Sequence, residues 1–407
     1  MRYTDCQNTE IRGLACTIGP GFESFSVEEL KPLFRELPDS VEMLQLMQRS
    51  GFDGFNFHSI VVSQNQKPIL FIPIYEACFN LSTFTEGPLK KLMSFMAWLL
   101  PDIFCPRVFG IGFVEGEWGA VGWDPKVNTA TLNNAWDLAL ATLKDMASKR
   151  RIHLTGFLNF NTQSDGGILP LDWLKEYTAI TGLPCAQLSL SPYQSVDDYL
   201  CALSHNTRKS LRKKLRLAKG IEIVRSQDPG IWIETIYKLY LDTLKRSDVS
   251  FGIQRLEFFK KVCHEVPGSE YVLYFSEKKL VAFNLLVRQK ELLLDKYFCM
   301  EYETGRHYSL YFISWLENIR YCIENKIPLY HAGQTVEKTK WRLGTRFISS
   351  VILFRHRNPI LHYLLTAFRN QFSYHPQIEI KASHKTESDP QVSFPKVEKN
   401  WRSPTII

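Results

Sequence analysis

The chain has 407 residues, of which 45% are hydrophobic and 22% are charged. This length allows about two or three domains with a substantial core, and the apolar content excludes an intrinsically disordered chain. The 49 basic residues outnumber the 42 acidic ones and give a net charge of +7. Seven of the basic residues lie within residues 204–219, which contain no acid. The rest of the chain therefore has equal numbers of basic and acidic residues. The excess charge therefore favours one local anionic partner over a general polyanion-binding surface.

The sequence shows no feature of export. Its first residues have no apolar run behind a basic flank, which a secretory signal requires. The longest apolar stretch, residues 92–104, is interrupted by Pro101 and Asp102 and is shorter than the roughly 20 residues that span a bilayer. The nine cysteines form no CxxC pair, which is typical of reduced core residues. We therefore expect a cytoplasmic protein without a membrane span, a disulfide framework or a metal site.

The predicted elements of the first half follow from hydrophobic periodicity and turn residues. In chain order they are a hairpin of strands at 59–62 and 68–74, a helix over 132–151, a strand over 153–157, a helix over 171–181 and a strand over 184–190. Ser191-Pro192 then marks a seam. We expect one domain over residues 1–190 and a second over 191–370, followed by a polar, proline-punctuated tail over 371–407.

The second half repeats this pattern. It begins with a basic helix over 204–219, a hairpin of strands at 271–275 and 281–287 and a strand over 291–300, followed by a helix over 308–325, a strand over 327–331, a helix over 336–343 and a strand over 347–354. Strands that alternate with helices predict an α/β architecture. Because hairpins occur beside crossovers, each sheet should be of mixed direction.

The basic helix is the most unusual segment. Leu211, Leu215 and Ala218 recur at helical spacing and predict one packed stripe, with Ser204 or Asn206 as a cap at the start. Arg208 and Arg212 belong to the remaining basic surface, where like charges four residues apart repel one another. The helix is either a solvated face or a surface that meets an anionic ligand.

Three further groups are candidates for a functional site. Gly305, Arg306, His307 and Ser309 lie where a strand gives way to a helix that begins near Tyr308, so they form either a phosphate cradle or a plain turn. His331 and Gln334 follow a short strand, at the edge where α/β sheets bind ligands, although an ordinary strand end fits equally well.

The third group lies within the strand over 291–300. Strict alternation places Asp295 and Tyr297 on one face of an otherwise apolar strand. Asp295 is therefore a candidate general base and Tyr297 a candidate proton donor, and the alternative is a structural salt bridge. The chain contains no P-loop, GxGxxG, GxSxG or HExxH motif, which disfavours the enzymes that these motifs mark.

Several segments, taken in order, resemble the GNAT superfamily, in its FemAB/CelD-like branch of double-domain acyltransferases. These segments are the Ser191-Pro192 seam, HNTRKSLRKKLR, LLLDKYFCM, ETGRHYSLYFISWLENIRYCIENK and GQTVEKTKWRLG. The resemblance covers residues 191–354 and implies two tandem GNAT-like domains, the first of them degenerate. It further implies that pantetheine enters between strands 291–300 and 327–331, that pyrophosphate meets Arg306, His307, Tyr308 and Ser309, and that Lys340 matches a lysine of the family.

The resemblance implies transfer of an acyl or aminoacyl group to an amine without a covalent intermediate. We expect acyl-CoA as the donor, no metal, and an amino-acid-like or peptide-like amine as the acceptor, in a secondary-metabolite or envelope pathway. Asp295 or His331 would accept the proton of the amine, Tyr297 or Tyr308 would protonate the leaving thiolate, and Gln334, Lys340, Arg208 and Arg212 would contact substrate. The alternatives are a non-catalytic binding module and a ligase that takes aminoacyl-tRNA on the basic helix.

Overall fold

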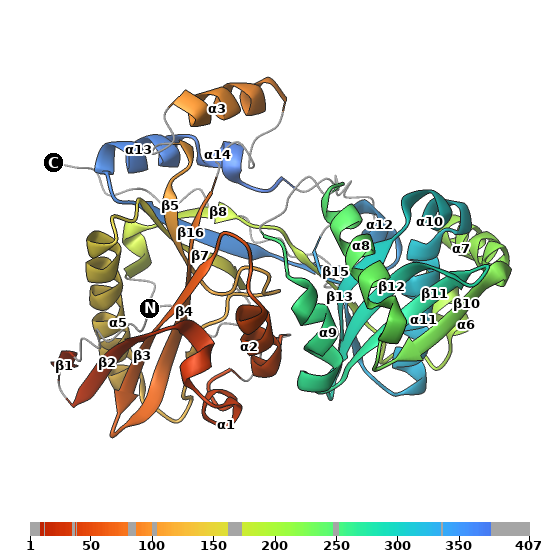
Figure 1. Ribbon diagram of the computed structural model, residues 1–407, viewed down its shortest axis with the longest axis horizontal. Helices are drawn as coiled ribbons and strands as arrows, with labels where there is room; N and C mark the ends of the chain where they lie inside the picture. The colour runs from red at the N-terminus through yellow and green to blue at the C-terminus, as the bar shows by residue number, and fades with distance from the viewer. Residues whose placement is uncertain are drawn as a thin grey trace, which may run out of the picture.

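The computed structural model describes residues 9–11, 13–34, 37, 39–79, 87–99, 104–161, 173–246, 252–334 and 337–375. Two mixed sheets, each flanked by helices, stand side by side (Figure 1). The predicted α/β class with two mixed sheets is therefore confirmed. Within the described ranges, no helix is both long enough and apolar enough to cross a bilayer. Most of the predicted tail, residues 376–407, lies outside the described residues.

The first sheet has nine strands in the order β1-β2-β3-β4-β5-β7-β16-β8, with β6 paired to β4. Only β5 and β7 run parallel, and the other pairs are antiparallel. The strands are β1 (Thr9–Ile11), β2 (Leu14–Gly19), β3 (Asn56–Gln64), β4 (Lys67–Cys78), β5 (Arg107–Ile111), β6 (Gly122–Trp123), β7 (Leu154–Asn161), β8 (Thr178–Thr181) and β16 (Ser350–His356).

The second sheet has seven strands in the order β10-β11-β12-β13-β14-β9-β15, and only β13 and β14 run parallel. Its strands are β9 (Cys185–Ser189), β10 (Ile221–Ser226), β11 (Ser269–Ser276), β12 (Lys279–Arg288), β13 (Leu292–Met300), β14 (Leu329–His331) and β15 (Arg346–Ile348). Both predicted hairpins are present, as β3–β4 and β11–β12. Each turn has two residues with positive φ, as a tight hairpin requires: Asn65 and Gln66, then Glu277 and Lys278.

The helices pack in layers on the faces of the two sheets. They are α1 (Val27–Leu30), α2 (Val41–Ser50), α3 (Gly87–Leu99), α5 (Thr129–Lys149), α6 (Val196–Ala202), α7 (His205–Leu217), α8 (Ile233–Leu244), α9 (Leu256–Glu265), α10 (Tyr302–Tyr308), α11 (Leu310–Glu324), α12 (Glu337–Arg342), α13 (Pro359–Ala367) and α14 (Arg369–Phe372), with short 3-10 turns at Gly21–Ser24, Trp173–Glu176, Ala218–Gly220 and Gly230–Trp232. The predicted cap of the basic helix is present, since Ser204 Oγ accepts a hydrogen bond from the Thr207 amide at 3.3 Å.

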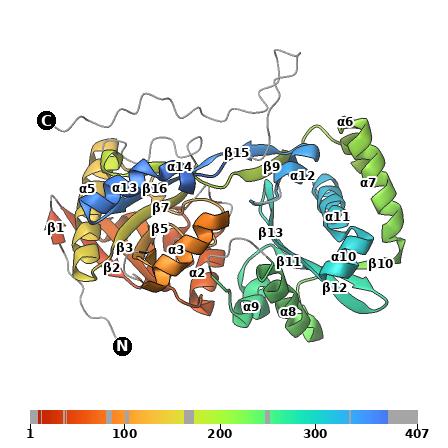
Figure 2. The same ribbon diagram turned by 90° about the horizontal axis from the view of Figure 1, so that it is seen from above.

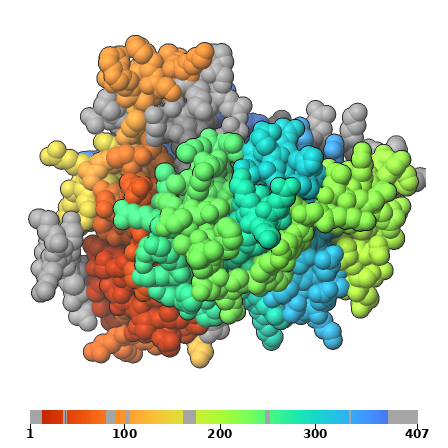
Figure 3. All heavy atoms as spheres, turned by 45° about the vertical axis from the view of Figure 1, so that its right-hand side comes forward, coloured from red at the N-terminus to blue at the C-terminus, as the bar shows by residue number. Residues whose placement is uncertain are grey.

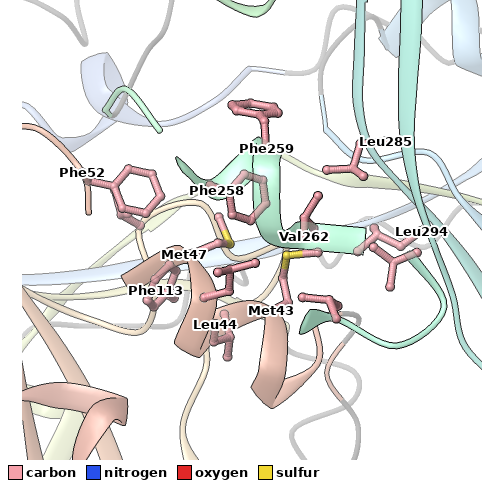
Figure 4. Packing of buried hydrophobic residues seen from close by; sticks show 14 of the residues in the cluster. Met43, Leu44, Met47, Phe52, Phe113, Phe258, Phe259, Val262, Leu285 and Leu294 are labelled. Carbon is pink, nitrogen blue, oxygen red and sulfur yellow. The ribbon is translucent and has the colours of Figure 1, made fainter. Parts of the chain in front are cut away.

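The layers enclose three apolar clusters, one of which both halves share. Helix α5 covers the outer face of the first sheet, and α11 covers the outer face of the second (Figure 2). Between the sheets, α2 from the first half packs against α9 from the second. Figure 4 shows Met43, Leu44 and Met47 of α2 against Phe258 and Val262 of α9. Because this cluster is shared, the two halves bury apolar surface on each other.

Two strands belong to the sheet of the opposite half. Strand β9 precedes the predicted seam at Ser191-Pro192, yet it pairs with β14 and β15 of the second sheet. Strand β16 lies within the predicted second domain, yet it pairs with β7 and β8 of the first sheet. The sheets therefore do not divide at residues 190 and 370, and the predicted strand over 347–354 is in fact two strands, β15 and β16, in different sheets.

Two helix predictions need correction. In the segment predicted as a helix over 171–181, the described residues, 173–181, form a 3-10 turn, Trp173–Glu176, followed by strand β8. Its residues Thr178–Thr181 include three β-branched side chains, which suit the pairing with β16. The strand-to-helix turn predicted at 301–309 is itself a helix, α10, and α11 begins only after Ser309, whose φ is 58°.

A candidate acid–base centre between the two halves

The site forms where β13 and β14 separate. Their parallel pairing extends only from Leu292 to Leu294 on β13. At the same point the register between β12 and β13 shifts, so that Leu285 pairs with Tyr297 and Leu286 with Asp295. The residue between these partners, Lys296, therefore occupies a β-bulge, and bulges redirect side chains.

The bulge corrects the predicted placement of Asp295 and Tyr297 on one face. Asp295 points toward α11, where Asn318 Nδ2 donates to its Oδ2 at 3.2 Å. Tyr297 points the other way, into the cluster of α8 and α9, and its hydroxyl donates to the Glu115 carboxylate. Because one extra residue in a strand inverts the alternation beyond it, the two side chains cannot act on the same group.

Asp295 holds four elements together. Besides Asn318 of α11, the Tyr330 hydroxyl of β14 donates to its Oδ2 at 2.7 Å, and Asn284 of β12 donates to its Oδ1 at 2.9 Å. Burial raises the pKa of Asp295 to about 6, although these hydrogen bonds act in the opposite direction. Its oxygens are thus already occupied by donors.

The bulge residue Lys296 reaches into the first half of the chain. Its Nζ donates to Asp39 Oδ1 at 2.8 Å and to the Glu115 carbonyl oxygen at 2.6 Å, and it lies 3.8 Å from Glu117 Oε1. Burial alone would lower the pKa of Lys296, but the charges of Asp39 and Glu117 outweigh it and raise the pKa. The other oxygen of Asp39 accepts the Glu117 amide at 2.8 Å, so one carboxylate fixes both residues.

Glu117 occupies the gap that opens between β13 and β14. Its Oε2 lies 4.0 Å from His331 Nδ1, and a Cβ built on Gly333 would lie 3.8 Å from that oxygen and equally close to the Asp295 carbonyl oxygen. The side chain of Glu117 is 12% exposed, so it borders solvent. Burial raises the pKa of Glu117 to about 7, and the charge of Lys296 limits the rise.

His331 and Cys185 complete the group. His331 ends β14 with none of its surface exposed, and burial lowers the pKa of its imidazole to about 4, so the ring is neutral. Its Nδ1 accepts the Gly333 amide at 3.2 Å, while Nε2 has no hydrogen-bond partner among the described residues. Cys185 of β9 donates its thiol to the Glu117 carbonyl oxygen at 3.3 Å, and burial raises the pKa of this thiol to about 12.

This group also has the spacing of metal ligands. Ligand atoms of Glu117, Cys185 and His331 lie within 4.8 Å of one another. Lys296, however, already places an ammonium group beside Glu117, and the Cys185 thiol keeps its proton. A cation here would have to displace both, so the arrangement suits proton transfer better than metal binding.

Lys340 of α12 lies at the edge of the site. Its buried Nζ donates to the carbonyl oxygens of Ala332 at 2.6 Å, Gly333 at 3.2 Å and Gln334 at 2.6 Å, and so fixes the chain that leaves β14. Burial lowers the pKa of Lys340 to about 8. Gln334 in turn donates from Nε2 to Cys185 Sγ at 3.6 Å. Two of the four predicted substrate contacts, Gln334 and Lys340, therefore lie beside the acid–base group.

The predicted cofactor residues lie elsewhere, at the corner of α10 and α11. Gly305 is buried, and a Cβ on it would meet Met300 Sδ at 2.4 Å, so this glycine accommodates a core methionine rather than a ligand. Arg306 and His307 are exposed, and Arg306 donates to the Tyr302 hydroxyl at 3.0 Å. Tyr308 lies beside Gly220, just beyond α7, with its hydroxyl 3.8 Å from where a Cβ of Gly220 would be.

The basic helix α7 packs along α11, with its C-terminal part beside this corner. Lys214 Nζ lies 4.4 Å from the centroid of the Phe312 ring. The other two predicted substrate contacts are engaged locally: Arg208 donates to the Cys201 carbonyl oxygen at 3.0 Å, and Arg212 lies 3.6 Å from Asp197. On α7 it is thus Lys214 whose charge lies against the first turn of α11.

Sequence reasoning missed Asp39, Glu115 and Glu117 because all three come from the first half. The segment Phe113–Ala120, FVEGEWGA, contained a usable signal. It carries two acids amid apolar residues and glycines, between two buried strands, where an unpaired carboxylate is costly. No local pattern, however, indicates that this loop meets a strand about 180 residues further on.

Comparisons with known proteins support the resemblance. A family model named FemAB-like, described as peptidoglycan biosynthesis/recognition, matches residues 183–388, about half of the chain. Among solved structures, FemX superimposes with a TM-score of 0.51 at 11% identity over 84% of this chain and 98% of FemX. No curated protein sequence matches the chain.

Two further structures align at a TM-score of 0.49 and 11% identity, each over 84% of this chain. One is a tandem GNAT protein from the clavulanic acid biosynthesis pathway, of which 99% is covered. The other is the C-terminal domain of a putative lysylphosphatidylglycerol synthetase from Agrobacterium fabrum, of which 95% is covered. At such identities, the likeness to FemX shows the fold alone. The family match spans half of the sequence and includes β13, β14 and the segment that carries Lys340, and on that ground the chain belongs to the FemAB-like family.

Proposed function

We propose that the chain is an N-acyltransferase that joins an acyl group to the amine of an amino-acid-like or peptide-like acceptor. The observation that carries the proposal is Glu117, a carboxyl group with a pKa of about 7 in the gap between β13 and β14. A base of this pKa is half ionised near neutral pH, where general base catalysis is most effective. The family membership and the helix-flanked sheets support a transferase of this kind.

The proposed reaction is a direct displacement. The amine nitrogen attacks the carbonyl carbon of a thioester, an amide bond forms and the carbon–sulfur bond breaks. Glu117 accepts the proton that the amine loses, and the leaving thiolate takes up a proton to give the thiol. The amine reacts in its neutral form, so the one proton that it loses on forming the amide is the one that Glu117 accepts. Lys296 and Asp39 keep the carboxyl group in place, since Asp39 binds both Lys296 Nζ and the Glu117 amide.

This assignment changes the roles that the sequence suggested. Asp295 becomes the anchor of β12, β13, β14 and α11, because three donors occupy its carboxyl group. His331, with its unpartnered Nε2, and Gln334 are proposed to position the acceptor. The hydroxyl of Tyr297 is engaged with Glu115 on the opposite face of β13, and Tyr308 lies beside Gly220 at the corner of α10 and α11. The thiolate is therefore proposed to take its proton from the Glu117 carboxyl group, once that group has accepted the proton of the amine.

For the donor we propose acyl-CoA, held at the corner of α10 and α11. Arg246 and Arg306 flank the Tyr302 ring there, with their guanidinium carbons 4.8 and 5.4 Å from its centroid. His307 and, from α7, Lys214 add positive charge around the start of α11. A helix start surrounded by cations suits a pyrophosphate group.

A donor assay tests the proposal. We expect the protein to release free thiol from acetyl-CoA or a longer acyl-CoA only when an amino acid or short peptide is present, with the amide product identified by mass spectrometry. Arg306→Ala should raise KM for the acyl-CoA about 10- to 150-fold, because one charge-assisted contact is worth about 1.5–3 kcal/mol. Lys290→Ala, an exposed lysine at another place, is the matched control. Failure of every acyl-CoA to bind in calorimetry would contradict this donor and favour a non-catalytic module.

One observation favours a second donor, an aminoacyl-tRNA. On α7, Lys209, Arg212, Lys213 and Arg216 are exposed along one helix, and Asp197 is the acid that lies near Arg212. A polyanion that bound this surface would release counterions, so its affinity would fall with salt. This donor would place the tRNA backbone on α7 and the aminoacyl group at the same acid–base centre.

Charge reversal separates the two donors. If tRNA binds α7, changing Arg212, Lys213 and Arg216 to glutamate should lower the slope of log affinity against log salt by about 2–3 and abolish binding at physiological salt. The control changes three exposed lysines on other elements, Lys126, Lys260 and Lys290, to glutamate. Equal loss of tRNA binding in both variants would show a nonspecific charge effect, and retained acyl-CoA turnover in the α7 variant would assign the donor to CoA.

A further inference from the structure

Helix α3 turns its apolar side chains outward. Leu92 and Phe95 are each 56% exposed and Trp98 is 77% exposed, whereas the small Ala97 faces inward with 6% exposed. A surface helix of a globular protein normally buries the large apolar stripe and exposes the polar one. Figure 3 shows the orange atoms of α3 projecting at the top of the molecule. This inverted arrangement indicates a contact that the described part of the chain does not make.

Helix α13 has the same character. Ile360 is 70% exposed, Tyr363 is 74% exposed and Phe368, just beyond the helix, is 59% exposed. Figures 1 and 2 show α3 and α13 on one side of the molecule, at the top of Figure 1 and toward the viewer in Figure 2. The two helices come from segments more than 250 residues apart, yet both carry exposed aromatic and aliphatic side chains.

The charged residues of these two segments have one sign. Residues 87–99 and 357–372 contain no aspartate or glutamate. Lys91, Arg357 and Arg369 are exposed beside the apolar side chains. We call the exposed side chains of α3 and α13, together with these three basic residues, the apolar–basic face.

We propose that the apolar–basic face docks on the surface of an anionic lipid bilayer. Aromatic side chains and lysine or arginine are favoured together at the boundary between headgroups and acyl chains. Helix α3 has 13 residues and is therefore about 20 Å long, too short to cross a hydrocarbon core of about 30 Å, so it lies on the membrane rather than through it. The face is separate from the acid–base centre, and its proposed role does not depend on the transferase activity.

The charge pattern favours a lipid surface over a second copy of the chain. In a two-fold symmetric dimer the same patch meets itself, so Lys91, Arg357 and Arg369 would face their own copies without an acid on the face to pair with. An anionic leaflet instead accepts the apolar and the basic side chains at once, and each basic residue adds about 1 kcal/mol of attraction.

Vesicle flotation with the full chain tests the proposal. We expect binding to phosphatidylcholine vesicles that contain about 30% phosphatidylglycerol, weaker binding to pure phosphatidylcholine, and a loss of the difference at high salt. The double variant Phe95→Ser/Trp98→Ser should lower the partition coefficient at least about tenfold, because two large apolar side chains no longer enter the interface. These side chains are exposed, so the substitutions should leave the circular dichroism spectrum unchanged.

Two controls make the result specific. Ile231→Ser removes an apolar side chain that is 86% exposed on a different part of the surface, and its binding should equal that of the parent chain. Lys91→Glu/Arg369→Glu should remove the preference for anionic vesicles. The proposal is overturned if the chain binds neither vesicle, if the Phe95/Trp98 variant binds as well as the parent, or if sedimentation shows a dimer that the same substitutions dissociate.

Discussion

Replacing Glu117 by glutamine should lower kcat about 100- to 10,000-fold, the usual contribution of a general base. Glutamine keeps the size of the side chain and the backbone amide that donates to Asp39, so the site should stay assembled. Only the ability to accept a proton is lost. Stopped-flow measurement of amide formation, with KM determined separately, checks that the effect falls on kcat.

The pH dependence gives an independent signature of the same residue. Because only the ionised carboxylate accepts a proton, kcat/KM for the parent chain should rise with pH through about 7 and then level off. This rising limb should be absent from the residual activity of Glu117→Gln. Under physiological conditions the enzyme would therefore work on the slope of its own titration.

Asp295→Asn serves as the matched control, because Asp295 is the base that alternation along the strand suggested. Its pKa is raised only to about 6 and its oxygens accept three hydrogen bonds, so we expect lower stability and a rising limb that persists. Because the charge of Asp295 helps to raise the pKa of Glu117, this limb should move to slightly lower pH. The opposite result would return the role of base to Asp295. In that case Glu117→Gln would keep full activity and the rising limb of the pH profile, and Asp295→Asn would lose both.

The contrast between these two carboxylates shows what could be predicted from the sequence. Local patterns were sufficient for the hairpins, for α5 and α11, and for the capped basic helix, because turn residues and periodicity act within a few positions. They also indicated that His331 and Gln334 follow a strand at the edge where ligands bind, whereas Lys340 was indicated only by the family resemblance. The bulge at Lys296, however, depends on the register with β12, which no property of β13 alone determines.

The remaining errors have the same origin. Strand β16 continues almost directly from β15, separated by Ser349, and only the positions of β7 and β8 decide that it crosses to the first sheet. Glu117 likewise becomes a candidate base only because the first half brings it to β13. Features that depend on contacts between the halves were thus inaccessible to local reasoning, and the catalytic proposal rests on them.

A second large effect is expected at Lys296. Its side chain is 2% exposed and that of its partner Asp39 is 3% exposed, so the pair is shielded from water. Lys296→Met should leave the Asp39 carboxylate buried without its counter-charge, at a cost of about 3–5 kcal/mol in the free energy of unfolding. Chemical denaturation followed by circular dichroism measures this loss. Lys279→Met is the control, because the pair of Lys279 with Glu301 is exposed and should be worth about 0–1 kcal/mol.

A partner substitution separates an unpaired charge from poor packing. Asp39→Asn combined with Lys296→Met removes both charges, so much of the lost stability should return, whereas a packing defect from the methionine would persist in the double variant. The single variant should also shift catalysis. Since the charge of Lys296 holds down the pKa of Glu117, its removal should move the rising limb of the pH profile above 7. An unmoved limb in a folded Lys296→Met protein would mean that the base of this reaction does not sense Lys296, and Glu117 would then be excluded from that role.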